Sequence, residues 1–362
     1  MPEDNKKKKV VLAAGGTGGH IFPAEALASE LLSQGCEVIL ITDKRYKKHI
    51  LTPDEMEVRV IAAASPSGGI FSKVKAVPVI LSGIRQAKSE LKKIKPDVVV
   101  GFGGYPSFPT MYAATKLKIK TVIHEQNCMM GKVNKVLCKS VSIIATSFRE
   151  VKGISEKYHN KVVLTGNPVR PAIKALRDIP YPDPDDGEVV QLLVIGGSQG
   201  ATIFSEVIPD AVCKLSEEIK SKIRIDQQCR EKDIEGVKKV YNEQGISANL
   251  TTFFEDIPTK IASAHIIIAR AGASTVSEIT VAGRPSILIP YKFAADDHQT
   301  VNAMALEKKE ATMLIKQDDF NSEELAKVLK SLLSNPEKLI TMARNSYSLG
   351  NTDAVKKLMN CL

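Results

Sequence analysis

The sequence predicts an α/β protein in which two doubly wound parallel-sheet domains follow one another. In both halves, short apolar runs alternate with segments of helical periodicity, which is typical of βαβ units. Each half opens with a strand-like run that leads into a glycine-rich turn, "GGTGGHIF" from Gly15 and "GGSQGAT" from Gly196. A segment rich in proline and aspartate separates the halves. With 362 residues, the chain is long enough for two domains.

In the first half, buried strands are expected where β-branched residues cluster between turn signals. They fall at 10–14, 37–42, 98–101, 121–124 and 143–146, with helical patterns at 24–33 and 132–138. We therefore expect a first domain over residues 1–169.

In the second half, the same rhythm restarts at "VVQLLVIGG". Further strands are expected at 223–226, 266–269 and 286–289. The tail has helical spacing, and its last part, about 343–362, is expected to pack back on the first domain. The second domain is then 170–342.

The composition is that of a soluble globular protein, with 43% hydrophobic and 25% charged residues. The apolar run after the basic N-terminus breaks at Gly15, which is too short for a signal peptide, and no run could span a bilayer. Six cysteines without a CxxC pair argue against a zinc site or a disulfide framework. We expect a cytoplasmic protein without a bound metal.

The net charge of +9 suggests a polyanionic partner, which could be a nucleic acid, an anionic membrane surface or a phosphorylated substrate. The chain has no tryptophan and only 5% aromatic residues, so it lacks the stacking platform of a single-stranded nucleic-acid binder. Nucleic-acid binding is therefore the weaker alternative.

The two glycine turns do not fit the dinucleotide-binding pattern G-x-G-x-x-G/A, and neither forms a P-loop. Both still place backbone N–H groups at a helix start, where the helix dipole favours an anion. One alternative is that the glycines only allow close packing. Two such turns, each opening a domain, instead favour phosphate binding in a cleft between the domains, which suits group transfer from a nucleotide.

The segment "RAGASTVSE" places hydroxyl groups at the start of a helix. Ser274, Thr275 and Ser277 are expected to cap this helix or to meet a phosphate. Glu278 can accept hydrogen bonds from both hydroxyls of a ribose, or it can simply complement the helix dipole.

The segment "DDHQTVNA" follows another strand end, so its polar side chains are candidates for binding sugar hydroxyls. The candidates are Asp297, Gln299 and Asn302. The alternative is a solvated loop that starts a helix.

Three residues are candidates for acid–base chemistry: His20, His124 and Glu125. His20 ends the first glycine turn, and imidazole titrates near neutrality. A lone histidine is more often structural, so His124 ranks below His20. Asn127 of "HEQN" can donate to a substrate oxygen.

Pro23 is expected in the first turn of the helix that follows the first glycine turn, where its missing N–H costs nothing.

The segment 70–95 contains seven basic residues and one acid. Apolar residues recur within it at helical spacing, at positions 80, 84, 87, 91 and 94. This stripe fits a core-packed helix with a solvated charged side. The charge of one sign, together with Ile70, Phe71 and Val74, favours an interfacial patch for an anionic membrane.

Together the motifs resemble those of MurG-type N-acetylglucosaminyltransferases over nearly the whole chain. The matching segments are "GGTGGHIFPA", "GGYPSFP", "HEQN", "GNPVR", "GGSQGA", "RAGASTVSE" and "DDHQTVNA", in the order of that family. The resemblance implies a GT-B fold, two Rossmann-like domains with the active site in the interdomain cleft. It also implies an enzyme without cofactor or metal, peripheral to the cytoplasmic face of the bacterial inner membrane.

The implied reaction moves N-acetylglucosamine, with inversion, from UDP-N-acetylglucosamine to the 4-hydroxyl of the N-acetylmuramyl-pentapeptide of lipid I, giving lipid II of peptidoglycan. His20 is the first choice for the base and Glu125 the second. The resemblance places substrate contacts at Thr17, Gly18, Gly19, Asn127, Arg170, Ser198, Phe254, Ala273, Ser274, Thr275, Val276, Ser277, Glu278 and Gln299. Among these, Arg170 and Ser198 match contacts to the diphosphate, and the backbone of Phe254 matches a contact to uracil.

The chain departs from the family pattern at several positions. Phe108 stands where many members have a small residue, which could reshape the acceptor pocket, and His298 replaces one of two paired glutamines. Alternatives with the same fold are a UDP-N-acetylglucosamine 2-epimerase and a glycosyltransferase with another lipid acceptor.

Overall fold

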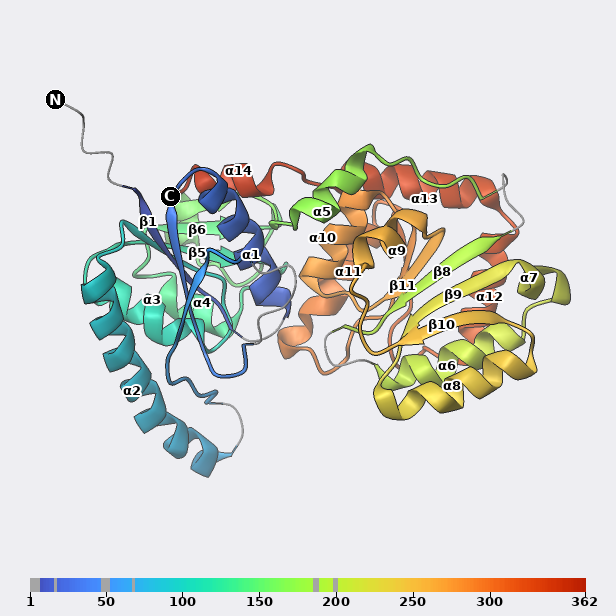
Figure 1. Cartoon of the computed structure of the whole chain (residues 1–362), viewed down its shortest axis with the longest axis horizontal. Coiled ribbons are helices and arrows are strands. Elements are labelled where there is room, and N and C mark those ends of the chain that lie inside the picture. Colours follow the sequence, from blue (N-terminus) through green and yellow to red (C-terminus); the bar gives the residue numbers. More distant parts are fainter. Residues whose placement is uncertain (1–6, 16–17, 47–52, 67–68, 185–188, 198–200) are drawn as a thin grey trace. The chain divides into compact units, whose positions relative to one another are not determined.

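The fold was analysed in a computed structural model that describes residues 7–15, 18–46, 53–66, 69–184, 189–197 and 201–362. For 70–73 and 295 it describes the backbone only. The chain forms two compact units (Figure 1). The first comprises Met1–Arg170 and Asp353–Leu362, and the second comprises Pro171–Thr352. Each unit is built on one parallel sheet, so the predicted two-domain α/β class is confirmed.

The first unit contains a seven-stranded parallel sheet of order β3-β2-β1-β4-β5-β6-β7. The strands are β1 (Lys9–Ala13), β2 (Glu37–Thr42), β3 (Glu57–Val60), β4 (Val98–Gly101), β5 (Lys120–Glu125), β6 (Ile143–Thr146) and β7 (Val162–Leu164). The central strands are runs of valine and isoleucine because helices cover both faces of the sheet. The strand order reverses between β1 and β4, where doubly wound sheets bind their ligands.

The helices of this unit lie on two faces. They are α1 (Gly18–Ser33), α2 (Ile70–Ile94), α3 (Ser107–Lys116), α4 (Lys132–Leu137), the 3₁₀ helix η1 (Glu156–Lys161) and α14 (Ala354–Met359). One core cluster joins Leu12 and Leu40 of the sheet to Leu27 of α1 and Leu358 of α14. The other joins Val11 to Leu91 of α2 and to α3.

Helix α1 begins earlier than the predicted 24–33, since Gly18, Gly19 and His20 already belong to its first turn. The expectation for Pro23 is therefore wrong, because Pro23 lies in the second turn of α1. There its ring removes a hydrogen bond that an N–H would give to the carbonyl of Gly19.

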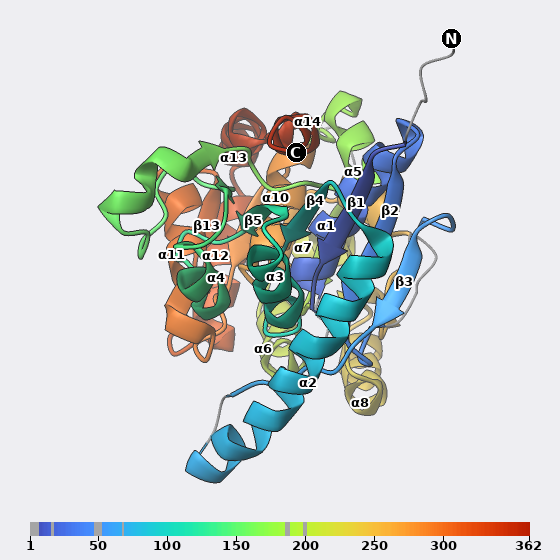
Figure 2. The ribbon, with the colours of Figure 1, turned by 90° about the vertical axis from the view of Figure 1, so that its left-hand side faces the viewer.

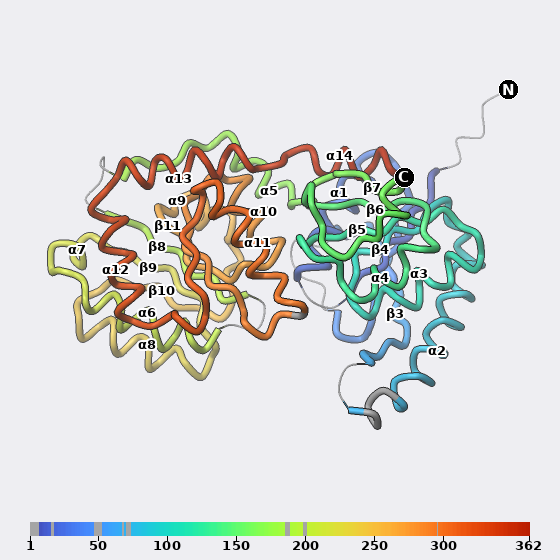
Figure 3. The backbone as a smooth tube through the Cα atoms, turned by 180° about the vertical axis from the view of Figure 1, so that it is seen from behind, coloured from blue at the N-terminus to red at the C-terminus, as the bar shows by residue number. Residues whose placement is uncertain are grey.

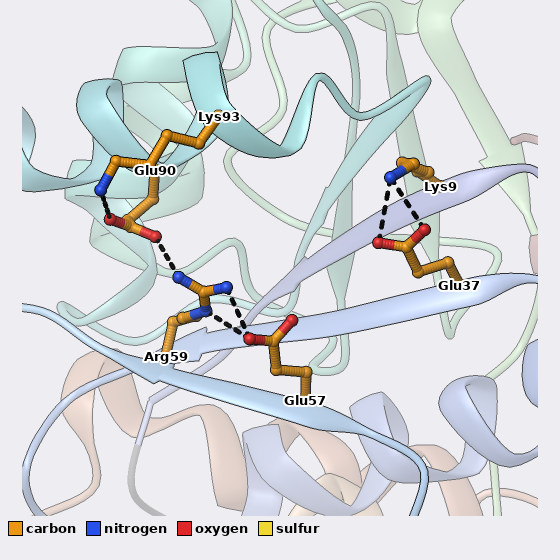
Figure 4. A network of polar contacts seen from close by, with 6 residues as sticks. All are labelled: Lys9, Glu37, Glu57, Arg59, Glu90 and Lys93. Atoms are coloured by element: carbon orange, nitrogen blue, oxygen red, sulfur yellow. Dashed lines mark hydrogen bonds and ion pairs between the residues drawn. The ribbon is translucent and has the colours of Figure 1, made fainter.

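Figure 4 shows ion pairs among β1, β2, β3 and α2 of the first unit. Lys9 pairs with Glu37 at 2.9 Å. The Arg59 guanidinium lies between Glu57, at 2.6 Å, and Glu90 of α2, at 2.7 Å. The pair of Arg59 with Glu90 joins β3, which the hydrophobic pattern did not predict, to α2, and the parallel ladder with β2 joins β3 to the sheet.

The second unit contains a six-stranded parallel sheet of order β10-β9-β8-β11-β12-β13. The strands are β8 (Val190–Ile195), β9 (Ile223–Gln228), β10 (Ser247–Thr251), β11 (Ile266–Ala269), β12 (Ser286–Leu288) and β13 (Thr312–Leu314). The order reverses between β8 and β11, so the second glycine turn and the "RAGASTVSE" segment follow the two strands at the switch point.

The helices of the second unit flank this sheet. They are α5 (Pro171–Lys174), η2 (Ala175–Asp178), α6 (Thr202–Cys213), α7 (Glu217–Lys222), α8 (Glu231–Glu243), α9 (Ile257–Ser263), α10 (Ala273–Ala282), η3 (Ala295–Asp297), α11 (His298–Glu307), α12 (Ser322–Leu333) and α13 (Pro336–Leu349). Phe204 of α6 packs edge-on against Phe320 within the core.

The C-terminal tail divides between the two units, which corrects the expectation that 343–362 packs as one piece on the first domain. Helix α13 packs on α10 in the second unit, whereas α14 packs on α1 (Figure 3). Of this C-terminal tail, only Asp353–Leu362 therefore belongs to the first unit.

Two arginines join segments of the second unit that lie far apart in the sequence. Arg177 stacks on the ring of Tyr347, 3.2 Å from its centroid, and donates to the Tyr347 carbonyl at 2.6 Å. Arg284 is buried and donates to five backbone carbonyls, including those of Ile261 and Pro180. Burial lowers the pKa of Arg284 to about 10, so the side chain stays charged.

Candidate functional site

In the first unit, the sequence motifs meet at the carboxyl edge of the sheet, because parallel strands all end there. The glycine turn follows β1, "GGYPSFP" follows β4, "HEQN" overlaps the end of β5, and "GNPVR" follows β7. The first two loops touch. A Cβ atom added to Gly15 would lie 2.5 Å from Cδ of Pro106, so only glycine allows this approach.

His20 lies against the loop after β4. Its Cδ2 atom is 3.0 Å from the position of a Cβ on Gly104, and its Cε1 atom is 3.4 Å from that on Gly103. Both glycines have positive φ, +83° at Gly103 and +72° at Gly104, which brings the backbone under the imidazole. The first turn of α1 thus presents His20 beside the topological switch point.

His124 is a buried structural histidine. Its Nε2 lies 2.9 Å from the Gly166 carbonyl, which can only accept, so Nε2 donates. Its Nδ1 then accepts from Nε2 of Gln126 at 3.0 Å. Burial lowers the pKa of His124 to about 4, and nearby His20 adds to this effect. His124 is therefore neutral at physiological pH and ties the end of β5 to the "GNPVR" loop.

Glu125 organises its own loop. Its Oε2 accepts from the Gly131 amide and from Nδ2 of Asn134, both at 2.9 Å. Its Oε1 accepts from the Asn127 amide at 3.1 Å and from the Asn127 side chain at 3.3 Å. Burial raises the pKa of Glu125, while these donors oppose the rise. The structure thus brings Asn127 and Glu125 together, with both carboxylate oxygens already engaged.

Arg170 is buried at the end of the "GNPVR" segment. Its guanidinium carbon lies 4.7 Å from the centroid of the Phe22 ring of α1. This cation–π contact joins the loop after β7 to the helix that carries His20. Gly18 and Gly19 lie in the first turn of the same helix, whereas Thr17 and Ser198 lie outside the described residues.

In the second unit, the start of α10 lies at the switch point between β8 and β11. The N-cap is Gly272, with no side-chain hydrogen bond, so the expectation that hydroxyls cap this helix is wrong. Ser277 donates instead to the Ala273 carbonyl at 2.8 Å. Glu278 is buried in the second turn. Ala273, Ser274, Thr275 and Val276 form the first turn.

Arg270, which directly follows β11, was not among the predicted site residues. Its Nη1 donates to the carbonyls of Ile289 and Pro290, at 3.1 and 3.3 Å. Its guanidinium lies 4.9 Å from the Phe204 ring centroid, and burial lowers its pKa. Arg270 fixes the loop after β12 to the start of the α10 segment. A basic residue directly after an apolar strand was the only signal for it.

Gln299 and Asn302 are both tied to backbone. Oε1 of Gln299 accepts from the Tyr291 amide at 2.9 Å, which places Gln299 at the end of the β12 loop. Asn302 is 0% exposed and donates to the Ala271 carbonyl at 3.1 Å. The expectation that Asn302 binds sugar hydroxyls is therefore wrong. Phe254 is buried in the loop after β10.

Two further expectations concern metal and Phe108. Across the described ranges, no three His, Cys, Asp or Glu side chains are grouped so that they could hold a metal ion. Asp185 and Asp186 of the proline- and aspartate-rich segment between the two halves lie outside those ranges. Phe108 stacks on Tyr112 with ring centroids 5.7 Å apart and packs against the core.

Comparison with known proteins relates the whole chain to one group of enzymes. The N-terminal domain model of glycosyltransferase family 28 matches residues 10–146, and its C-terminal domain model matches 191–358. Two relatives named UDP-N-acetylglucosamine--N-acetylmuramyl-(pentapeptide) pyrophosphoryl-undecaprenol N-acetylglucosamine transferase are 46% and 48% identical. They come from Rhodospirillum centenum and Paramagnetospirillum magneticum. Each alignment covers 98% of this chain, with 93% and 95% of the respective relative.

Solved structures share the fold. A crystal structure of Acinetobacter baumannii MurG is 29% identical, with a TM-score of 0.77 and 98% of each chain covered. A UDP-N-acetylglucosamine 2-epimerase is 16% identical, with a TM-score of 0.67 over 98% of this chain and 95% of its own. At that identity the epimerase shows a common fold and nothing about activity.

Proposed function

The chain belongs to the family of UDP-N-acetylglucosamine–N-acetylmuramyl-(pentapeptide) pyrophosphoryl-undecaprenol N-acetylglucosamine transferases, and we propose that it carries out their reaction. It transfers N-acetylglucosamine from UDP-N-acetylglucosamine to lipid I and so produces lipid II for peptidoglycan. The observation that carries this proposal is the identity of 46–48% over 98% of the chain. The grouping of the motif loops at the carboxyl edges of both sheets supports it.

The second unit binds the donor nucleotide sugar in this proposal. The N-terminal turn of α10, Ala273–Val276, and Ser277 offer N–H and hydroxyl groups to the diphosphate. Glu278 accepts from the ribose hydroxyls. Gln299 and the backbone of Phe254 contact the sugar and the uracil, and Ser198 contacts the diphosphate. The placement of α10, Gln299 and Phe254 after strand ends of the second sheet supports the roles of these residues.

The chemical step is a direct displacement with inversion. The acceptor 4-hydroxyl oxygen attacks the anomeric carbon, the bond from that carbon to UDP breaks, and the hydroxyl proton passes to a base. His20 is our choice for the base, because its imidazole lies beside the β1/β4 switch point. Thr17, Gly18 and Gly19 of the first turn, Asn127 and Arg170 contribute further contacts to the donor, which stabilise the developing charge.

Glu125 serves better as a positioning residue than as the base. Four hydrogen bonds from its own loop occupy its two oxygens, so a proton taken from the substrate would have to displace one of them. The same bonds hold Asn127 in place. This arrangement supports a role for Glu125 in shaping the "HEQN" loop.

Within the described residues, no helix is both long and apolar enough to cross a membrane. We place the protein at the cytoplasmic face of the cell membrane as a peripheral enzyme, bound through α2. The apolar stripe predicted in 70–95 turned out to be core, since Ala87 and Leu91 are buried. Other apolar residues of α2 are exposed instead: Val74, Val77, Val79 and Leu81. For Ile70 and Phe71 the side chains are not among those described.

The test is transfer of labelled N-acetylglucosamine to a lipid I analogue in the presence of a metal chelator. Wild-type enzyme should form lipid-linked product. His20→Ala should lower kcat by about 10²–10⁴-fold, as expected for loss of a general base. Glu278→Ala should act mainly by raising the KM for the donor. A pH–rate profile that loses its acidic limb in His20→Ala would identify the base. Epimerisation of UDP-N-acetylglucosamine without transfer would overturn the proposal.

A further inference from the structure

Arg45 is a cation held in place at the carboxyl edge of the first sheet. Asp43 directly follows β2 and is 3% exposed. Its Oδ2 accepts from Nε of Arg45 at 2.7 Å. The Arg45 guanidinium carbon also lies 4.6 Å from the centroid of the Tyr105 ring. A buried carboxylate and an aromatic face therefore fix the plane of a side chain that is 43% exposed.

The hydrogen-bond donors of Arg45 are only partly used. Among the described residues, Nε is the only group of Arg45 with a hydrogen-bond acceptor, so its two terminal amino groups remain available. Arg59 of β3 provides the contrast (Figure 4). It is similarly exposed, at 39%, but Glu57 binds its Nε and Nη2, and Glu90 binds its Nη1. Two amino groups on one fixed guanidinium match two oxygens of a phosphate.

Arg45 lies next to the loop that contacts His20. Tyr105, on which Arg45 stacks, follows Gly104, on which the His20 imidazole lies. The neighbouring Pro106 touches Gly15 of the first glycine turn. In the acceptor, the reacting 4-hydroxyl and the diphosphate are at opposite ends of one sugar ring. His20, the proposed base for the 4-hydroxyl, lies on Gly104, and Arg45 stacks on the next residue of the same loop. Arg45 is thus placed to bind the diphosphate.

We propose that Arg45, positioned by Asp43 and Tyr105, binds the diphosphate of the lipid-linked acceptor. This inference rests on the proposed function for the identity of the ligand. The recognised chemistry is a prenyl diphosphate ester, bound by the two terminal amino groups of the guanidinium. Arg45 would then favour acceptors that carry the diphosphate over neutral muramyl sugars, without contributing to binding of the nucleotide donor.

The first experiment compares wild type, Arg45→Ala, Arg45→Lys and the control Arg59→Ala in steady-state transfer. Arg45→Ala should raise the KM for the lipid I analogue about 10–100-fold, the size expected for loss of a bidentate charged contact. Its kcat and its KM for UDP-N-acetylglucosamine should stay within about twofold. Arg45→Lys keeps a charge beside Asp43, but an ammonium cannot make a bidentate contact. Its KM for the lipid I analogue should therefore fall between those of wild type and Arg45→Ala. Arg59→Ala should match wild type.

A second experiment separates this inference from the proposed function. Calorimetry measures binding of geranyl diphosphate to enzyme whose donor site is saturated with UDP, with geraniol as the neutral probe. Wild type and Arg59→Ala should bind geranyl diphosphate, and Arg45→Ala should lose this binding while keeping the same melting temperature within a few degrees. Equal binding by Arg45→Ala and wild type would overturn the inference. Absence of transfer by wild type would overturn the proposed function alone, since geranyl diphosphate binding still decides the role of Arg45.

Discussion

At the scale of single residues, burial separates two histidines that the sequence presents as alternatives. His124 uses both ring nitrogens within the fold, whereas His20 lies on the glycine loop after β4. The ranking of His20 above His124 as the base agrees with these surroundings and stays a prediction until tested. Burial and partners of this kind come from distant segments, such as Gly166 for His124, so a single stretch of sequence does not reveal them.

The neutral state of His124 predicts a specific dependence of stability on pH. Its pKa is about 4 in the folded protein, against 6.5 for an ordinary histidine. Between these values the unfolded chain binds a proton that the folded protein does not, so stability falls as pH drops through this window. The loss should approach about 3 kcal/mol by pH 4.

Urea unfolding of wild type and His124→Gln, measured from pH 7 to pH 4, checks this expectation. Glutamine can donate to the Gly166 carbonyl and accept from Gln126 without titrating. The difference in unfolding free energy between the two proteins should therefore shift in favour of His124→Gln as pH falls. A difference independent of pH would mean that His124 is not held neutral.

Asn302 and Pro23 show the limit of prediction for single residues. The sequence placed Asn302 among ligand-binding residues because it follows a strand end. In the structure the side chain turns inward to the Ala271 carbonyl. Pro23 was misplaced because α1 extends through Gly18 and Gly19, and glycine usually argues against a helix interior.

At the scale of elements, the strands were the most predictable part of the fold. Runs such as 98–101 and 266–269 are apolar throughout because both sheet faces are covered, and they were placed correctly. Strand β3 was missed, since its residues are partly exposed and two of its four residues are charged. Its backbone ladder with β2 and the pair of Arg59 with Glu90 leave no apolar pattern to detect.

The Glu125 carboxylate accepts the hydrogen bonds that shape the "HEQN" loop, and this leads to a second prediction. In Glu125→Gln, an amide would face N–H donors that now bind a carboxylate oxygen. Each unsatisfied buried donor costs roughly 1–3 kcal/mol, so unfolding free energy should fall by about 2–4 kcal/mol. Transfer activity should fall as well, because Asn127 loses the hydrogen bonds to Glu125 that hold it in place.

Denaturant unfolding and steady-state kinetics on the same preparations distinguish the roles of Glu125. The matched control is Glu37→Gln, which breaks an exposed pair with Lys9 and should cost less than about 1 kcal/mol. A role as the base would instead abolish kcat while leaving stability unchanged. That result would make Glu125 the base and leave His20 to position the acceptor.

At the scale of the whole molecule, the sequence predicted two tandem parallel-sheet units because each repeats the order of strand, glycine turn and helix. It did not predict which unit the C-terminal helices join. Helical spacing shows that a segment is amphipathic but not which surface it covers. The division follows from tertiary contacts such as Arg177 with Tyr347, which hold α13 in the second unit.

The proposed membrane association of the molecule is assigned to α2, whose first half projects beyond the rest of the first unit (Figure 2). Val77 and Leu81 are exposed by 52% and 59%, on a helix with several lysines and one arginine. Burying each such side chain in the headgroup region is worth up to about 1.5–3 kcal/mol, and the basic residues add attraction to anionic lipid. Val77→Asp combined with Leu81→Asp should therefore lower binding to vesicles containing phosphatidylglycerol by at least about tenfold.

Sedimentation with such vesicles, at low and high salt, measures this change. The control is Val60→Asp, which places one aspartate at a valine of β3 that is as exposed as Leu81, at 59%, and should bind vesicles like wild type. Transfer to a water-soluble acceptor analogue should be unchanged in all three proteins, because Val77, Leu81 and Val60 are exposed and are not packed in the core. Equal vesicle binding by the double variant and wild type would move the membrane contact away from this part of α2.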